Sequence, residues 1–173
     1  MDAGADVDAG QVGVEYDMTT SILETPVSAP AGSNYEQDFY AWAMKNAVLL
    51  RQRRFAEIDA DNIAEELESM GRSEKRELVN RLAVLLTHLL KWRHQPNRRG
   101  NSWRYTIKEQ RRAVFKSLRD NPSLRSQLPE YLNEAYEDAL LKVIKQTGLD
   151  EGAFPPACPF TLDQLMDDDF WPE

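Results

Sequence analysis

The sequence predicts an all-α fold, an antiparallel bundle of about five to six helices. Apolar residues recur at steps of three and four along most of the chain, which is the spacing of one helix face. No stretch alternates apolar and polar residues clearly enough to indicate a β-strand. The chain has 173 residues and is 42% hydrophobic, which is enough apolar material for one packed core. We therefore expect a single helical domain over residues 35–173.

The first 34 residues are set apart by their composition. They contain six acidic residues and no Lys or Arg, and they lack an amphipathic period. Such a segment cannot bury enough apolar surface to fold by itself, so we predict a flexible acidic tail over residues 1–34. The chain contains no run of about 18 apolar residues, so we expect no membrane-spanning helix.

The first helix is predicted from about residue 34 to residue 54. Ser33 or Asn34 is the expected N-cap, because either side chain can accept a hydrogen bond from an early backbone N–H. Its expected buried stripe, at helical spacing, consists of Phe39, Trp42, Ala43, Ala47 and Leu50.

The next helical stretch follows Asp59 or Asp61, either of which can cap it. Its first apolar face is Ile63, Leu67 and Met70, and its second is Leu78, Leu82, Leu85, Leu86, Leu89 and Trp92. Gly71 and Ser73 favour a break or a kink between the two faces. An unbroken helix from Asp61 to His94 would span about 50 Å, which is long for a small domain. We therefore expect a long helix pair kinked near Gly71.

Proline and glycine mark the remaining boundaries. Pro96 and Gly100 end the preceding helix, and the next helix is expected to bury Trp103, Ile107, Val114, Phe115 and Leu118. Pro129 suits the start of a last long helix and Gly148 its end. The buried stripe of that helix is Leu132, Ala135, Tyr136, Ala139, Leu140, Val143 and Ile144. Thr161 and Gln164 resemble a capping box, and the apolar C-terminal end is expected to fold back onto the bundle.

Charge is strongly segregated along a chain whose net charge is −8. Residues 81–125 contain twelve basic and two acidic residues, whereas residues 126–173 contain two basic and eleven acidic ones. The basic block is suited to an anionic partner. Alternatively, the acidic flanks neutralise it within one chain or across a dimer, and this is the interpretation we prefer.

The segment Lys91–Tyr105, KWRHQPNRRGNSWRY, is basic and aromatic and contains no acid. This pattern suits phosphate or nucleic-acid binding over residues 91–112. The candidate phosphate-binding or partner-binding residues are Lys91, Arg98, Arg99 and Arg104. The periodicity also allows Trp92 and Trp103 to be core anchors on either side of a turn, and we prefer that interpretation for the two tryptophans.

An acidic cluster offers an alternative chemistry. Glu65 and Glu68 share a helix face, and Asp38 on the preceding helix can join them. Three such carboxylates suit Mg²⁺ or Mn²⁺ in a divalent-metal phosphohydrolase. The simpler interpretation is that acids in the first turns of a helix favour its dipole and solvate its outer face. The sequence contains no phosphate-binding glycine loop, GxSxG, HExxH or CxxC motif, so we expect no cofactor and favour a protein that is not an enzyme.

Several separated motifs resemble one family. They are Tyr35-Glu36-Gln37-Asp38-Phe39-Tyr40-Ala41-Trp42, Ala64-Glu65-Glu66-Leu67-Glu68-Ser69-Met70-Gly71-Arg72-Ser73-Glu74, His88-Leu89-Leu90-Lys91-Trp92, Gln95-Pro96, Ser102-Trp103-Arg104, Cys158-Pro159 and Phe170-Trp171-Pro172. In this order they resemble the uncharacterised bacterial family called domain of unknown function 29, over about residues 35–173. The resemblance implies an all-helical bacterial protein and no particular reaction. Asp38, Glu65, Glu66 and His88 are carried over as shared polar positions without assigned roles.

The sequence favours a helical interaction module with segregated acidic and basic faces. Its expected partner is another protein or a second copy of the chain, with nucleic acid less favoured and a membrane not expected. The chain has one cysteine, Cys158, which excludes an internal disulfide and suits a reducing compartment. We therefore expect a cytoplasmic protein.

Overall fold

A computed structural model describes residues 35–173, which divide into two compact units. The first unit ends at Asp59 and the second runs from Ala60 to Glu173. The described residues form five α-helices with short 3₁₀ turns and no β-strand, which confirms the all-α prediction. The acidic tail predicted for residues 1–34 lies outside the described residues, and the single domain predicted over residues 35–173 stays a prediction.

The first unit is built on helix α1, Phe39–Arg51. The predicted cap at Ser33 or Asn34 is wrong, because Asp38 is the N-cap and its Oδ1 accepts from the Ala41 N–H at 2.9 Å. The helix also ends earlier than predicted. Shortly after its end, Arg53 adopts a left-handed backbone with φ of 59°, which is incompatible with a continuing helix.

Polar contacts hold the inner face of α1. Trp42 Nε1 donates to Asp59 Oδ2 at 2.9 Å, and the backbone N–H of Asp59 donates to Asn46 Oδ1 at 2.8 Å. The buried residues of α1 are Ala41, Trp42, Asn46 and Leu49. Of the predicted stripe, Trp42 is buried and Ala43 and Ala47 are half-buried, whereas the prediction is wrong for the exposed Phe39 and Leu50. The inner face includes Asn46, whose polar side chain the apolar pattern could not include.

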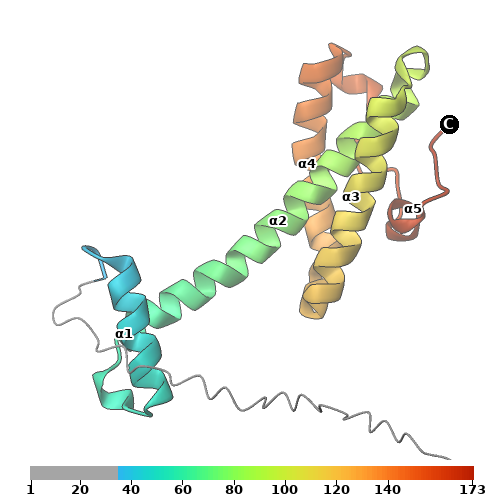
Figure 1. The fold of residues 1–173 in the computed structure, drawn as a ribbon. Coiled ribbons are helices and arrows are strands. Elements are labelled where there is room, and N and C mark those ends of the chain that lie inside the picture. Colours follow the sequence, from blue (N-terminus) through green and yellow to red (C-terminus); the bar gives the residue numbers. More distant parts are fainter. Residues whose placement is uncertain (1–34) are drawn as a thin grey trace, which may run out of the picture. The chain divides into compact units, whose positions relative to one another are not determined.

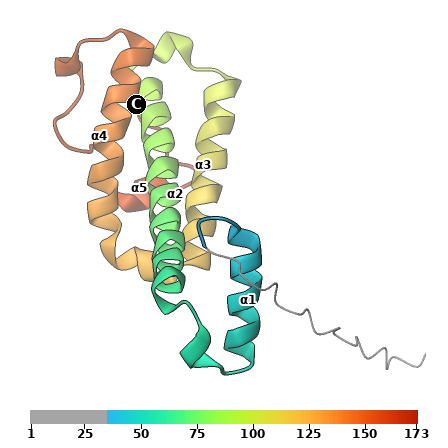
Figure 2. The ribbon, with the colours of Figure 1, turned by 90° about the vertical axis from the view of Figure 1, so that its left-hand side faces the viewer.

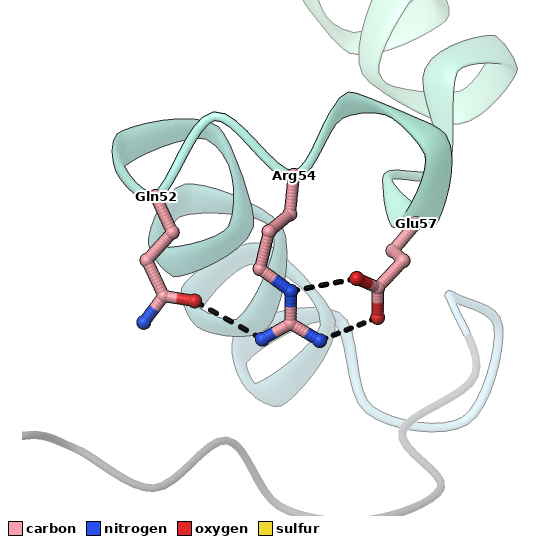
Figure 3. A network of polar contacts seen from close by, with 3 residues as sticks. All are labelled: Gln52, Arg54 and Glu57. Atoms are coloured by element: carbon pink, nitrogen blue, oxygen red, sulfur yellow. Dashed lines mark hydrogen bonds and ion pairs between the residues drawn. The ribbon is translucent and has the colours of Figure 1, made fainter.

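An exposed arginine closes the loop after α1. Figure 3 shows Arg54 between Gln52 and Glu57, with Nε at 2.6 Å from Glu57 Oε1 and Nη1 at 3.1 Å from Gln52 Oε1. The short 3₁₀ helix Phe55–Glu57 places the carboxylate for this paired contact. Because all three side chains are solvent-exposed, the contact orders the loop locally and contributes little to overall stability.

The second unit is a bundle of three long helices, α2 (Ala60–His94), α3 (Asn101–Asp120) and α4 (Leu128–Thr147). Figures 1 and 2 show α3 running antiparallel to α2 and α4 returning in the direction of α2. The core lies between them. Its fully buried members are Leu78, Leu82, Ala83, Leu85, Leu86, Leu89 and Leu90 from α2, Ile107 and Val114 from α3, Ala135, Ala139 and Val143 from α4, and Leu165 from the short helix α5 (Leu162–Met166).

Helix α2 is one uninterrupted helix of 35 residues. The predicted break at Gly71 is therefore wrong, and Figure 1 shows no sharp bend in α2. The roughly 1 kcal/mol that a mid-helix glycine costs is outweighed by the strong helix formers around it. The length does not conflict with a small bundle, because the buried residues of α2 begin only at Leu78. The predicted inner face in its first half is also wrong, since Leu67 is 63% and Met70 64% exposed.

We expect alanine substitutions of Gly71, within α2, and Gly148, at the end of α4, to have opposite effects on stability. At Gly71 a Cβ would meet nothing within 4 Å, so we expect G71A to raise the free energy of unfolding by about 0.5–1 kcal/mol. Gly148 ends α4 in the left-handed conformation with φ of 70°, so we expect G148A to lower it by about 1 kcal/mol. Urea denaturation followed by circular dichroism measures both. Two shifts of the same sign would contradict this description of α2 and α4.

The C-terminal segment packs against the bundle, as the sequence predicts. The capping box of helix α5 (Leu162–Met166) is confirmed, with Thr161 and Gln164 bonded reciprocally. Tyr136 of α4 donates its hydroxyl to the Pro155 carbonyl at 2.6 Å, and burial raises the pKa of this tyrosine to about 12. Within residues 35–173, no helix has the length and apolar content needed to cross a membrane.

Candidate functional site

Three tryptophans gather around the connection between α2 and α3. Trp92 and Trp171 have ring centroids 4.7 Å apart, so the C-terminal segment stacks on the end of α2. Lys91 Nζ lies 4.6 Å above the ring of Trp103. Trp92 is buried and Trp103 is partly buried against the core, so both serve as the anchors that the periodicity indicates.

The four cations predicted to bind phosphate lie around these tryptophans, and three of them have partners within the chain. Lys91 Nζ donates to Gln146 Oε1 at 3.1 Å, and burial lowers the pKa of this lysine. Arg99 Nε donates to the Trp92 carbonyl at 2.8 Å, and Arg104 stacks over Trp171 at 5.9 Å. Arg98 is exposed in the short 3₁₀ helix Pro96–Arg98. Three of the four side chains are therefore held by contacts within the chain, and the binding role of all four stays a prediction.

A buried arginine that the sequence reasoning missed organises the C-terminal segment. Arg111 on α3 is only 2% exposed. Its guanidinium donates to the carbonyls of Leu165 at 3.1 Å, Asp168 at 3.2 Å and Phe170 at 2.6 Å. Burial lowers the pKa of Arg111, and the neighbouring carboxylates of Asp167, Asp168 and Asp169 oppose that shift. Two signals in the sequence could have indicated this role. Arg111 falls at helical spacing between Ile107 and Val114, and an acidic run, Asp167–Asp169, lies near the C-terminus.

The outer face of α3 carries a row of cations and exposed aromatics, which we call the α3 basic face. Its members follow each other at helical spacing: Tyr105, Lys108, Arg112, Phe115, Lys116 and Arg119. Tyr105 is 69% and Phe115 is 56% exposed, which shows that the prediction of a buried Phe115 is wrong. Arg119 pairs with the adjacent Asp120 at 2.9 Å. Among the described residues, no carboxylate lies within 4 Å of the charged groups of Lys108, Arg112 or Lys116.

A groove runs beside this face, between α3 and the C-terminal segment. Its volume is about 440 Å³, and it is lined by Arg111, Arg112, Phe115, Lys116, Arg119, Met166 and Asp168. Phe115 and Met166 provide an apolar surface, and the cations of α3 line it with positive charge. Such a groove suits an elongated acidic segment that brings an apolar side chain of its own.

The acidic residues predicted as a metal alternative are distributed along the chain. Asp38 caps α1 in the first unit, whereas Glu65 and Glu68 lie on α2 in the second. Glu68 is paired with Arg72 at 3.2 Å. In the part of the chain that the structure describes, no three His, Cys, Asp or Glu side chains are grouped so that they could hold a metal ion. Glu66 lies on the same helix, one residue beyond Glu65.

His88 is a packing residue with a defined hydrogen bond. It lies on α2, and its Nδ1 is 2.9 Å from the Val84 carbonyl, a geometry in which a neutral ring donates from Nδ1. Burial lowers the pKa of His88, and the charge of Lys91 adds to the shift while the hydrogen bond opposes it. Glu65 is on the same helix, about 35 Å away along its axis, so these two shared polar positions do not form one site.

The lowered pKa of His88 predicts a pH dependence of stability. When the pH falls below the ordinary histidine value of 6.5, the unfolded chain binds the proton before the folded one does. His88 therefore reduces the free energy of unfolding between pH 6.5 and its lower folded-state pKa, and it has no effect at higher pH. An NMR titration of the ring protons, assigned with H88Q, measures this pKa. A folded-state value at or above 6.5 would contradict the packing of His88.

These features define a small all-α protein whose helical bundle is closed by its own C-terminal segment and carries a basic face on α3. The chain belongs to the family described as "Domain of unknown function DUF29", whose model matches residues 34–171. This match confirms the resemblance indicated by the separated motifs. A comparison with curated proteins gave no match, and neither did a comparison with solved structures. The family description assigns no activity, so the function has to be inferred from the surface of the molecule.

Proposed function

We propose that this chain is a protein-interaction module whose α3 basic face binds an acidic helical segment. The observation that supports it is the row of Lys108, Arg112 and Lys116, which have no acidic partner within the described residues, beside two exposed aromatic side chains. A row of cations next to a groove with the apolar side chains of Phe115 and Met166 is complementary to an amphipathic acidic helix. The apolar contacts supply affinity, and the charges supply orientation and discrimination.

An acidic protein segment suits this face better than a nucleic acid does. The chain has a net charge of −8, which opposes the approach of a long polyanion. Of the cations in the segment 91–112, Lys91, Arg99 and Arg104 are engaged with carbonyl, amide or tryptophan groups of the chain itself. Nucleic-acid binding is therefore the second candidate, and the experiment below distinguishes the two.

The test is a fluorescence-anisotropy titration with two labelled probes of equal length. One is a synthetic amphipathic peptide with Glu on one helical face and Leu on the other, and the second is a single-stranded oligonucleotide. We expect the peptide to bind, its affinity to fall with added salt, and the double variant R112A/K116A to weaken it on the order of tenfold. The matched control is K142A/K145A, which removes two cations from α4.

Three outcomes would overturn the proposal. They are no peptide binding, an equal loss of affinity in K142A/K145A, and tighter binding of the oligonucleotide than of the peptide. Retained secondary structure in all variants, checked by circular dichroism, ensures that a loss of binding reports on the surface and not on the fold.

We also propose that this module works in the bacterial cytoplasm. Cys158 is partly buried, its thiol donates to the Phe160 carbonyl at 3.4 Å, and burial raises its pKa, so it is an unreactive free thiol suited to a reducing compartment. Fractionation of cells that express the full chain tests this location, and recovery of the chain from the periplasm or the membrane would contradict it.

A further inference from the structure

The acidic counterpart of the α3 basic face is present on the same unit. Helix α4 exposes Glu130, Glu134 and Glu137 at steps of four and three, and Leu141 follows after another step of four. Leu141 is 71% exposed, which is unusual for a leucine on a helix that buries four other apolar side chains and two tyrosines within the bundle. We call this row the α4 acidic face.

The two faces match in length and in chemical order. The stretch from Tyr105 to Lys116 on the α3 basic face and the stretch from Glu130 to Leu141 on the α4 acidic face each span eleven residue steps, or about 17 Å of helix. If the helices are aligned antiparallel with Tyr105 opposite Leu141, then Arg112 falls opposite Glu134 and Lys116 opposite Glu130. The exposed side chains of Tyr105 and Leu141 then meet each other, and these two cations meet opposite charges.

These faces do not neutralise each other within one copy. The ion pairs seen on them are local or involve other helices: Arg119 pairs with Asp120, and Glu134 pairs with Lys75 of α2 at 3.0 Å. No ion pair within residues 35–173 joins a cation of α3 to a carboxylate of α4. A second copy of the chain supplies the missing partner for each face at once.

We propose that the chain associates with itself, the α3 basic face of one copy binding the α4 acidic face of another. This inference rests on the proposed function, because it identifies the acidic segment as α4 of a second copy. The contact is heterologous, with different surfaces on its two sides, so each copy offers one donor face and one acceptor face. The pairing is electrostatic at its centre and therefore weakens as salt is added.

The test is a charge-swap experiment on the full chain, followed by sedimentation velocity. One variant, K108E/K116E, reverses the α3 basic face, and a second, E130K/E137K, reverses the α4 acidic face while leaving the Lys75–Glu134 pair intact. We expect the unmodified chain to show an average mass that rises with concentration at low salt and returns to that of the monomer at about 0.5 M salt. Each variant alone should stay monomeric, because like charges then face each other.

An equimolar mixture of the two variants distinguishes a specific contact from general charge effects. The reversed α3 of the first is complementary to the reversed α4 of the second, and their unmodified faces are also complementary. We expect the mixture to regain the association of the unmodified chain. A mixture that stays monomeric, or an unmodified chain that is monomeric at every concentration, would overturn the inference.

The peptide titration separates this inference from the proposed function. E130K/E137K keeps the α3 basic face, so it should bind the acidic peptide as well as the unmodified chain does. If the unmodified chain binds the peptide but never associates with itself, self-association is refuted and the interaction module stands. If it does neither, both are refuted.

Discussion

Replacing Arg111 by methionine is expected to lower the free energy of unfolding by about 3 kcal/mol. Methionine keeps most of the side-chain volume but leaves three backbone carbonyls, those of Leu165, Asp168 and Phe170, without their donor. Buried carbonyls that lose a charged donor cost more than the net value of the bonds they made. Chemical denaturation measures the loss, and hydrogen exchange should show faster exchange in residues 162–171.

The control for this substitution is the next residue on the same helix. Arg112 is exposed and has no partner among the described residues, so R112M should change the free energy of unfolding by less than about 0.5 kcal/mol. Equal effects at the two positions, or unchanged exchange of the C-terminal segment in R111M, would show that Arg111 does not hold that segment in place.

Truncating Leu85 to alanine is expected to cost about 2–5 kcal/mol of unfolding free energy, because the side chain is fully buried between the long helices. The matched substitution is L67A on the same helix. Leu67 belongs to the first apolar face predicted for that helix but is 63% exposed, so its truncation should cost less than about 0.5 kcal/mol. Denaturation curves of the two variants measure the contrast.

The two leucines also test how α2 is used. If L67A destabilises the protein as much as L85A does, the first half of α2 is also buried in solution. That result would contradict the exposed position of Leu67. A large effect of L85A alone supports a helix whose C-terminal half is core and whose N-terminal half is not.

Periodicity predicted the parts of the fold where apolar residues alone decide the packing. The face from Leu78 to Trp92 on α2, the left-handed end at Gly148 and the capping box at Thr161 are all confirmed. Each depends on residues close together in the sequence, so local spacing contains the information.

The sequence-based predictions are wrong where polar contacts, or contacts between residues far apart in the sequence, determine which side chains are buried. Asn46 and Arg111 are buried because of hydrogen bonds to groups outside their own helix, and an apolar count assigns such residues to the surface. Phe115 is exposed although it continues the apolar spacing of α3. The prediction of a break at Gly71 was wrong for another reason. It assumed that a helix of this length had to fit inside the domain, whereas α2 places only its second half in the core.

The candidate site was also predicted only in part from the sequence. Sequence reasoning found the basic block and its aromatic residues, because composition alone reveals them. It assigned binding to Lys91, Arg98, Arg99 and Arg104, three of which have intramolecular partners. Lys108, Arg112 and Lys116, which have no carboxylate partner among the described residues, lie further along α3, and only the fold shows which side of that helix is exposed.

The most direct test of the central claim is to locate the binding surface by NMR. The acidic amphipathic peptide is titrated into ¹⁵N-labelled full-length chain, and backbone amide shifts are followed residue by residue. Binding through the α3 basic face predicts shifts concentrated at Tyr105, Lys108, Arg112, Phe115 and Lys116, with little change on α1. Shifts concentrated on α1 or around Arg98, or no shifts at all, would contradict it.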